Sequence, residues 1–441
     1  MINQTEQMMY RLNNLDTRYQ KNTYQKSTGE ILQNGSDDSV LYARVVFIDD
    51  KIRTFEGLES QVQKAAVQNN AADSSMKEIK KILDQIKYEL VKANTDTTGN
   101  DGKAAISATI SGLKENLYQL ANTQVENQYV FAGSDASIKP FEKNSITGKI
   151  TYVGDNQFKK IAVEEGSYRE AGITGFDMMM YPSSTATKGG TLTFQSTDRI
   201  IDQAGNEWKM RTPISSGNSL TFSSGQKILD NNSKIWTLNA SNQLEDNLGN
   251  ISSALVTDNL NGTYTFTVPA SQSMRINDIV KYDSSNQIVD TIALTGNDGL
   301  IPPTYTATMP TTDGIKFEAK TNIFDFIDDT VNALNKVDSA GNPITDALSK
   351  TLISNSVEES KKAYDGVNVA HAELGGKNKI FEISLERISS KLTQYNILSQ
   401  EIGAADLTKV AVEAKALELT YTALYSTISK TNELSLVNFL N

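Results

Sequence analysis

The sequence has no cysteine and a single histidine, His371, among its 441 residues. Disulfide bonds and thiol catalysis are therefore excluded. One histidine cannot form the paired-histidine zinc motifs, and its scarcity removes the usual general base of an enzyme. We therefore expect no enzymatic activity, no metal site and no cofactor, with His371 as a solvated or interhelical residue.

Long apolar runs are missing as well. No segment is long enough to span a bilayer, and Met1–Tyr10 lack the apolar core of a signal peptide. The net charge is -11 with no visible compensating basic patch, which argues against a nucleic-acid partner. These features fit a cytosolic protein, or one that is exported without a cleaved signal peptide.

Proline is missing from both ends of the chain. All eight prolines lie between Pro140 and Pro343. Because a proline inside a helix costs about 3 kcal/mol, its absence leaves the two ends free to form long helices. At 441 residues and 38% hydrophobic content, the chain should form two or more domains with narrow apolar seams.

Apolar or small residues recur at alternating steps of three and four from Phe55 to Ala93, which is typical of a helical seam. The pattern predicts a helix from Ser39 onward that breaks, if anywhere, near Asn69–Asn70. Similar seams predict helices over 106–120 and 363–395, the second of which is interrupted at Gly375–Gly376.

Two thinner seams lie at opposite ends of the chain. As a two-helix pair they would bury little apolar area, so we expect contacts between subunits to complete their burial. The predicted subunit-interface residues are Met8, Leu12, Leu15, Tyr19, Leu417, Tyr421, Leu424, Ile428, Leu434, Leu436, Phe439 and Leu440.

Between the helical ends the apolar period changes to two. Thr263–Val268 alternate after the turn signal Asn261–Gly262, and a hairpin is expected around Gly154–Asn156. Trp208 and Trp236 are the expected core anchors. Short strands of this kind predict a β-sandwich or barrel. The expected fold class is therefore a mainly α coiled coil or helical bundle from both ends, with an inserted β-rich domain (α+β multidomain).

Three further patterns allow a functional and a structural interpretation. Asp37–Asp38 precede an apolar helix pattern, which favours helix capping over a catalytic carboxylate pair. Asp246–Asn250 and Asp258–Gly262 lack the twelve-residue loop of an EF-hand, so turns are favoured over calcium binding. The run Met178–Met180 is interpreted as a buried strand edge rather than a binding surface.

Several stretches, in their order and spacing, resemble the flagellin superfamily, and most closely its hook–filament junction proteins, the third hook-associated proteins. These stretches are Gln7–Tyr10, Ser27–Gly29 with Asn34 and Ser36–Asp38, Tyr129–Gly133 with Pro140–Phe141, Tyr152–Asp155, Ala372–Gly375 with Asn378, and Leu434–Leu440. Two positions depart from the family pattern. Ser39 stands where the family has proline, and His371 where it has arginine.

The resemblance implies three domains. They are an inner assembly domain of terminal helices (residues 1–40 and 400–441), a helical-bundle domain (41–139 and 318–399) and an outer β-rich domain (140–317). Residues 181–315 match no known part of the family and are interpreted as an enlargement of the variable outer domain.

The resemblance also implies a function, that of an extracellular structural subunit of the bacterial flagellum. Copies of the chain would form an adaptor ring between hook and filament. The implied partners are other copies, the first hook-associated protein, flagellin, and a cytosolic export chaperone that holds Leu417–Leu440. Export would use the flagellar type III apparatus without a signal peptide. Two alternatives stay open: flagellin itself, and a surface binding module in residues 181–315.

Overall fold

The structure is a computed structural model. It describes residues 2–232, 234–283, 285, 287–297, 304–310 and 316–440. In the first and last helices, side chains are described only from Glu6 onward and up to Lys430. The chain divides into two compact units. Unit 1 comprises Met1–Lys64, Ile161–Arg169 and Ile380–Asn441, and unit 2 comprises Ala65–Lys160 and Glu170–Lys379.

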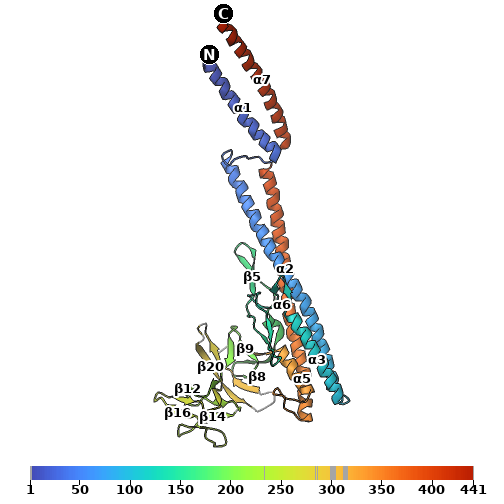
Figure 1. Cartoon of the computed structure of the whole chain (residues 1–441), viewed down its shortest axis with the longest axis vertical. Coiled ribbons are helices and arrows are strands. Elements are labelled where there is room, and N and C mark those ends of the chain that lie inside the picture. Colours follow the sequence, from blue (N-terminus) through green and yellow to red (C-terminus); the bar gives the residue numbers. More distant parts are fainter. Residues whose placement is uncertain are drawn as a thin grey trace. The chain divides into compact units, whose positions relative to one another are not determined.

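Helices form both ends of the chain, as the missing prolines predict (Figure 1). The helices are α1 (Ile2–Thr28), α2 (Ser39–Ala93), α3 (Asn100–Ala121), α4 (Gly175–Met179), α5 (Ile323–Leu334), α6 (Asp346–Gly403) and α7 (Leu407–Leu440). The capping role of Asp38 is confirmed, because its Oδ1 accepts the backbone N–H groups of Val40 and Leu41 at 3.1 and 2.9 Å. The predicted fold class, helical ends around a β-rich insert, is confirmed.

The predicted interruption at Gly375–Gly376 is wrong, and the break that the pattern allows near Asn69–Asn70 does not occur. Helix α2 continues through Asn69–Asn70, and α6 continues through Gly375–Gly376. A glycine inside a helix costs about 1 kcal/mol relative to alanine, which tertiary packing readily offsets. Leu374 and Phe381, on either side of the glycine pair, are buried and supply such packing.

The helical core of unit 2 joins the second half of α2 to α3, α5 and the first half of α6. Its fully buried side chains include Met76, Ile79, Ile86, Ile110, Leu117, Phe324, Ile327, Ala363 and Leu374. At its edge, His371 Nε2 lies 2.8 Å from Asp73 Oδ1, which confirms the interhelical interpretation of this histidine.

The larger sheet of unit 2 has eight antiparallel strands in the order β7-β22-β9-β10-β19-β20-β21-β8. The strands are β7 (Met180–Thr187), β8 (Thr191–Gln195), β9 (Arg199–Asp202), β10 (Glu207–Met210), β19 (Asp278–Tyr282), β20 (Ile288–Asn297), β21 (Thr304–Thr308) and β22 (Lys316–Asn322). Strands β7 and β8 stand at opposite ends of this order, yet the Thr193 N–H donates to Ser184 Oγ at 3.3 Å. The sheet therefore curls into a nearly closed barrel.

A second group of strands lies between β10 and β19 along the chain. It comprises β11 (Ile214–Ser215), β12 (Ser219–Ser223), β13 (Ile228–Asp230), β14 (Ile235–Leu238), β15 (Leu244–Glu245), β16 (Leu255–Asp258), β17 (Thr263–Thr267) and β18 (Ser273–Ile276). These strands form sheets β11-β18-β13-β14-β15 and β12-β17-β16. Trp236 is buried in the core of this group, whereas Trp208 is buried in the eight-stranded sheet. Both tryptophans are core anchors, of two separate clusters.

Three small hairpins precede the large sheet. They are β1 (Gln124–Val125) with β2 (Gln128–Tyr129), β3 (Phe141–Lys143) with β4 (Ile150–Tyr152), and β5 (Lys159–Glu164) with β6 (Ser167–Ala171). The predicted hairpin around Gly154–Asn156 is therefore wrong. The Asp155 carboxylate instead accepts the N–H groups of Ser134 and Gln157, both at 2.9 Å, which ties this loop to an earlier segment.

The prediction for Met178–Met180 is partly wrong. All three side chains are buried, but Met178 and Met179 end the short helix α4, and the strand begins only at Met180. The Thr174 side chain accepts the Asp177 N–H, which caps this helix turn.

Candidate assembly surface

Helices α1 and α7 of unit 1 lie side by side and antiparallel (Figure 1). Leu417 and Val410 are buried on α7, and Leu15 is buried on α1. The Asn22 side-chain amide donates to the Val410 carbonyl at 3.0 Å, which satisfies a polar group in the seam. The single chain therefore already pairs its two termini, although the fully buried strip is narrow.

The predicted interface residues differ in how far the α1–α7 pair buries their side chains. Leu15 and Leu417 are buried, and Tyr19 is 46% exposed, with its ring centroid 6.2 Å from that of Tyr421. The half-buried members are Met8, Leu12, Tyr421, Leu424 and Ile428. Leu434, Leu436, Phe439 and Leu440 lie outside the described side chains. The structure thus brings Leu15, Tyr19, Leu417 and Tyr421 together within one chain, and their contact with other subunits stays a prediction.

Large apolar side chains also lie on the outer faces of this pair, and the seam analysis missed them. Met9 and Tyr10 on α1 are 62% and 71% exposed, and Val412 and Leu419 on α7 are 67% and 64% exposed. Val412 and Leu419 are seven residues apart, a spacing that places them on one helix face. This heptad step is the sequence signal that could have identified them.

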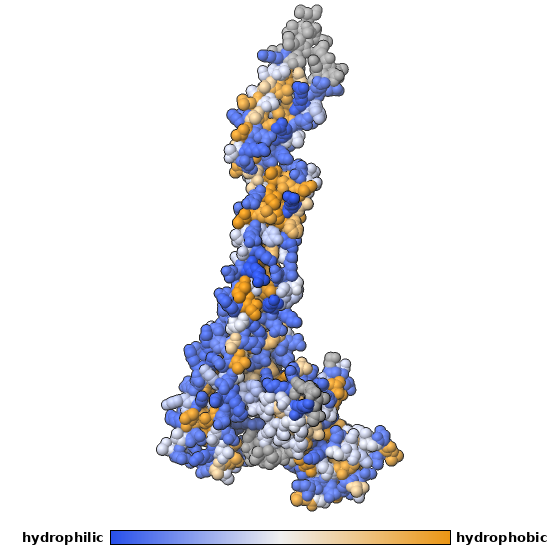
Figure 2. Space-filling view, turned by 180° about the vertical axis from the view of Figure 1, so that it is seen from behind, coloured by the Kyte–Doolittle hydropathy of each residue, from blue (hydrophilic) through white to orange (hydrophobic). Residues whose placement is uncertain are grey.

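A second set of exposed apolar residues lies at the start of α2 and the end of α6. On α2 the set comprises Val40, Tyr42, Val46 and Phe47. Ile397 and Leu398 lie on α6, and Leu407 is the first residue of α7. Figure 2 shows apolar side chains gathered in patches along the helices of unit 1, separated by hydrophilic surface. Exposed apolar patches of this kind mark interaction surfaces on soluble proteins. We name the exposed residues of both sets the unit 1 apolar surface.

The two connections that flank the terminal helices are joined by backbone hydrogen bonds. The Ile31 N–H donates to the Gly403 carbonyl, and the Ala405 N–H donates to the Gly29 carbonyl, both at 2.8 Å. Gly29 has a φ of +76°, a conformation that residues with a Cβ rarely adopt. These bonds join the connection between α1 and α2 to the connection between α6 and α7.

Charged side chains tie the tip of the β5–β6 hairpin to the helices of unit 1. Lys51 Nζ on α2 lies 2.7 Å from Glu165, and Lys391 Nζ on α6 lies 2.8 Å from Glu164. Hydrogen bonding to Glu165 raises the pKa of Lys51 above its ordinary value. Between these contacts Phe55 and Tyr395 stack with ring centroids 5.5 Å apart. The α2–α6 pair is therefore braced, whereas the exposed apolar residues beside it have no such cover.

Comparison with known proteins finds a family match over the first third of the chain. Residues 2–136 match the family model of the bacterial flagellin N-terminal helical region. This part of the chain is therefore similar to the N-terminal helical region of bacterial flagellins. Helices α1, α2 and α3 of the structure all lie within it.

Two curated relatives carry the same, more specific name. The chain is 28% identical over 184 residues to flagellar hook-associated protein 3 of Escherichia coli (strain K12), covering 38% of this chain and 54% of that protein. It is 25% identical over 148 residues to the protein of the same name from Salmonella typhimurium, covering 31% of this chain and 44% of that protein. The chain thus spans about half the length of the curated relatives it matches. These matches confirm the resemblance to hook–filament junction proteins, and they support a flagellar structural protein.

Solved structures give similar matches at low identity. A crystal structure of Xanthomonas campestris FlgL is 15% identical, with a TM-score of 0.43, and covers 78% of this chain and 98% of its own. Flagellar hook-associated protein 3 from Legionella pneumophila is 14% identical, with a TM-score of 0.45, and covers 81% of this chain and 98% of its own.

Among the described residues, no helix is both long and apolar enough to cross a membrane.

Proposed function

We propose that this chain is a structural subunit of the bacterial flagellum that assembles into an adaptor ring between hook and filament. The observation that carries the proposal is the incomplete burial of the α1–α7 pair. Only a narrow strip is buried within one chain, and Val412, Leu419, Met9 and Tyr10 stay more than 60% exposed. Burial of apolar surface at about 25 cal/mol per Å² would stabilise an assembly that covers these residues.

The partners follow from the same proposal. Other copies of the chain would cover the unit 1 apolar surface, with the first hook-associated protein on one side of the ring and flagellin on the other. A cytosolic export chaperone would hold the Leu417–Leu440 stripe until the chain leaves the cell through the type III apparatus. On this proposal, residues 1–40 and 400–441 form the inner domain, 41–139 and 318–399 the neighbouring helical domain, and 140–317 the outer domain.

A truncation in the native organism tests the proposal. Removing residues 431–441 should leave hooks on the cells but release unassembled flagellin into the medium, because the terminal stripe is part of the assembly surface. The measurements are electron microscopy of the cells and immunoblotting of the medium. A control is Leu248→Ser with Leu260→Ser, which changes two residues that are 80% and 92% exposed, in the turns before and after strand β16. Normal filaments on the truncated strain would contradict the proposal.

A second candidate function is a binding module in residues 181–315, carried on the same chain. The observation that favours it is a cavity beside strands β7 and β8, whose lining includes Tyr181 and Phe194 from this segment. Flagellin itself, the third candidate, is favoured by the family match of residues 2–136 as much as a junction subunit is. Abundance distinguishes the two, since a filament subunit must be plentiful and a junction subunit scarce.

A further inference from the structure

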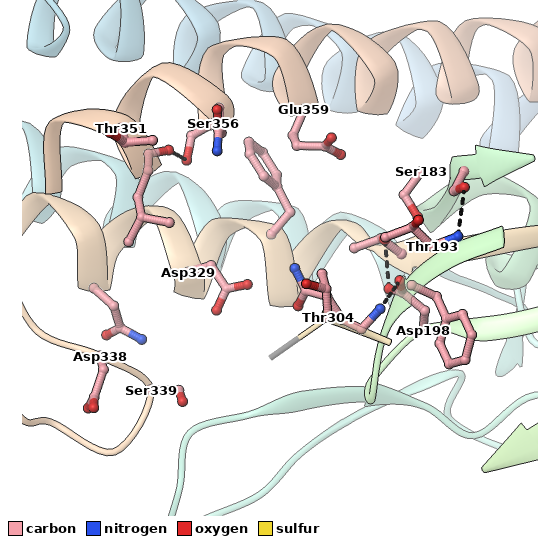
Figure 3. A pocket seen from close by; sticks show the side chains of 18 of the residues that line it. Ser183, Thr193, Asp198, Thr304, Asp329, Asp338, Ser339, Thr351, Ser356 and Glu359 are labelled. Carbon is pink, nitrogen blue, oxygen red and sulfur yellow. Dashed lines mark hydrogen bonds between the residues drawn. The ribbon is translucent and has the colours of Figure 1, made fainter. Parts of the chain in front are cut away.

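Unit 2 contains a cavity of about 580 Å³ that assembly does not explain (Figure 3). Its walls come from β7, β8 and the loop that follows β8, from helices α5 and α6, and from the connection between these helices. This volume lies within the range of 300–1,000 Å³ that is usual for sites that bind small molecules. The cavity is therefore large enough for a ligand of its own.

The lining is acidic. Asp198, Asp329, Asp338 and Glu359 contribute carboxyl groups, and no lysine, arginine or histidine is among the described residues that line the cavity. Opposite charges within a low-dielectric cavity attract strongly, and like charges repel. The lining therefore selects against anions and favours a cation.

Three of the four carboxylates already have protein partners. Asp198 accepts the Thr321 hydroxyl at 2.7 Å and the Gln195 N–H at 2.8 Å. Glu359 accepts the Tyr181 hydroxyl at 2.9 Å and pairs with Lys362 at 2.8 Å. Asp338 accepts backbone N–H groups of its own turn. These three groups shape the cavity wall and have little capacity left for a ligand.

Asp329 differs from the other three. No hydrogen bond or ion pair joins it to any residue within the described part of the chain, and its side chain is half-buried. Figure 3 shows its carboxylate pointing away from α5 into the cavity, which Asp338 and Ser339 also line. Burial raises the pKa of Asp329 to about 7, and the nearby Asp325 and Asp328 add to the effect. A half-buried carboxylate without a partner is costly, and a bound cation would lower this cost.

The remaining lining indicates which kind of cation fits. In the described residues, no group of three or more acidic or histidine side chains is close enough together to hold a metal ion. Three aromatic side chains, Tyr181, Phe194 and Phe326, do line the cavity. Aromatic faces attract ammonium groups and their carbon chains, whereas metal ions need several oxygen ligands. We propose that the cavity binds a small organic amine, whose ammonium group pairs with Asp329.

A series of three ligands of equal length tests this proposal on the full chain. The probes are 1,5-diaminopentane, 1,5-pentanediol and glutarate, which carry two positive charges, no charge and two negative charges. The diamine should bind saturably in calorimetry and raise the midpoint of thermal unfolding, because only it supplies the missing cation. Equal binding of the diol, or no binding of the diamine, would overturn the proposal.

A pair of variants locates the binding site. Asp329→Asn should lower the affinity for the diamine at least tenfold, and it should fold, since an amide resembles the neutral carboxyl of a group whose pKa is about 7. The matched control is Asp365→Asn, which makes the same charge change at an exposed position of α6 outside the cavity. An equal loss of affinity in both variants would indicate non-specific charge attraction and overturn the assignment.

The pH dependence gives an independent measurement. Affinity should rise between pH 5.5 and 8.5 as Asp329 ionises, and Asp329→Asn should abolish this rise. The other charged groups that act on Asp329 are Asp325 and Asp328 on the same helix, Asp198 on the sheet side, and Lys149, which lowers its pKa. Glu359 and Asp338 also line the cavity. A pH profile that is the same in both proteins would overturn the role of Asp329.

Discussion

At the scale of single residues, one aspartate turn recurs through unit 2. In Asp202, Asp230, Asp246 and Asp338, the Oδ1 atom accepts the backbone N–H groups of the residues two and four positions later. These bonds occupy the oxygen atoms that a metal ion would need. In Asp246–Asn250, for example, the aspartate side chain bonds to the backbone of its own loop, and these bonds hold the loop in a turn.

Two of these turns also anchor a tryptophan. Asp202 Oδ2 accepts the indole N–H of Trp208 at 3.1 Å, and Asp230 Oδ2 accepts that of Trp236 at 3.0 Å. In each case the tryptophan follows the aspartate by six residues and lies across a hairpin. Because only six residues separate them, each aspartate turn and its buried tryptophan form one local structural unit.

We predict that Asp202→Ala destabilises unit 2 by about 2–3 kcal/mol, because the buried indole N–H of Trp208 loses a charged acceptor. Urea unfolding followed by tryptophan fluorescence measures the loss. Asp283→Ala is the matched control, since Asp283 forms the same turn with Ser285 and Gln287 at an exposed site. Its cost should stay below about 1 kcal/mol. Equal costs for the two variants would show that the indole bond contributes nothing.

At the scale of elements, the connection between α1 and α2 depends on a glycine in a left-handed conformation. Gly29→Ala should destabilise unit 1 by about 1 kcal/mol, because alanine at a φ of +76° is strained. Gly57→Ala, the control, lies in the exposed middle of α2 with open space around the added Cβ, and should stabilise the helix by about 0.5–1 kcal/mol. Thermal unfolding followed by circular dichroism compares the two. A stabilising Gly29→Ala would refute the need for a left-handed residue there.

Substitutions on the exposed and the buried face of helix α7 should have different effects, the first on assembly and the second on stability. Val412→Ser with Leu419→Ser changes only exposed residues, so the stability of the single chain should change by less than about 0.5 kcal/mol while filament formation is lost. Leu417→Ala, only two residues before Leu419 but buried, should instead cost about 2–5 kcal/mol. Unfolding of the purified chain and microscopy of complemented cells provide the two measurements. Normal filaments on cells with the double serine variant would remove this face from the proposed interface.

At the scale of the whole molecule, the strands from β11 to β18 form an insertion within the eight-stranded sheet. Strands β10 and β19 are paired neighbours, with Met210 opposite Ile279. Arg211 and Asp278, the next pair, form a two-point ion pair at 2.9 and 2.7 Å. The chain thus leaves the sheet and returns to it at one place.

This topology predicts that the insertion can be removed. Replacing residues 212–277 by Asn-Gly should close β10 and β19 into a two-residue hairpin and leave the eight-stranded sheet folded. Leu229, which packs in the core of that sheet, would be lost, so Tm should fall by roughly 5–10 °C. Size-exclusion chromatography, thermal unfolding and motility are the measurements. Loss of filaments from cells with this folded variant would show that the insertion takes part in assembly.

The sequence by itself determined the helical ends and their start signals. The absence of proline outside 140–343 and the three-and-four spacing of apolar residues are local properties of the chain, and helices are stabilised by local contacts. Asp38 illustrates this, since the cap and the groups it binds lie within three residues. The terminal seam was visible for the same reason. The outward Val412 and Leu419 were missed because their signal is a single heptad step outside the buried seam, which is much shorter than the seam pattern itself.

Only the tertiary structure decided how the strands pair and where the cavity lies. Strand β7 pairs with β22, more than a hundred residues later, and the strand at Ile150–Tyr152 pairs backwards with Phe141–Lys143 rather than across Asp155. A strand has many chemically acceptable partners, and the choice depends on which faces are buried together. Asp329 became a candidate binding residue only because α5, α6 and the edge of the sheet close around it, which no local pattern of residues can specify.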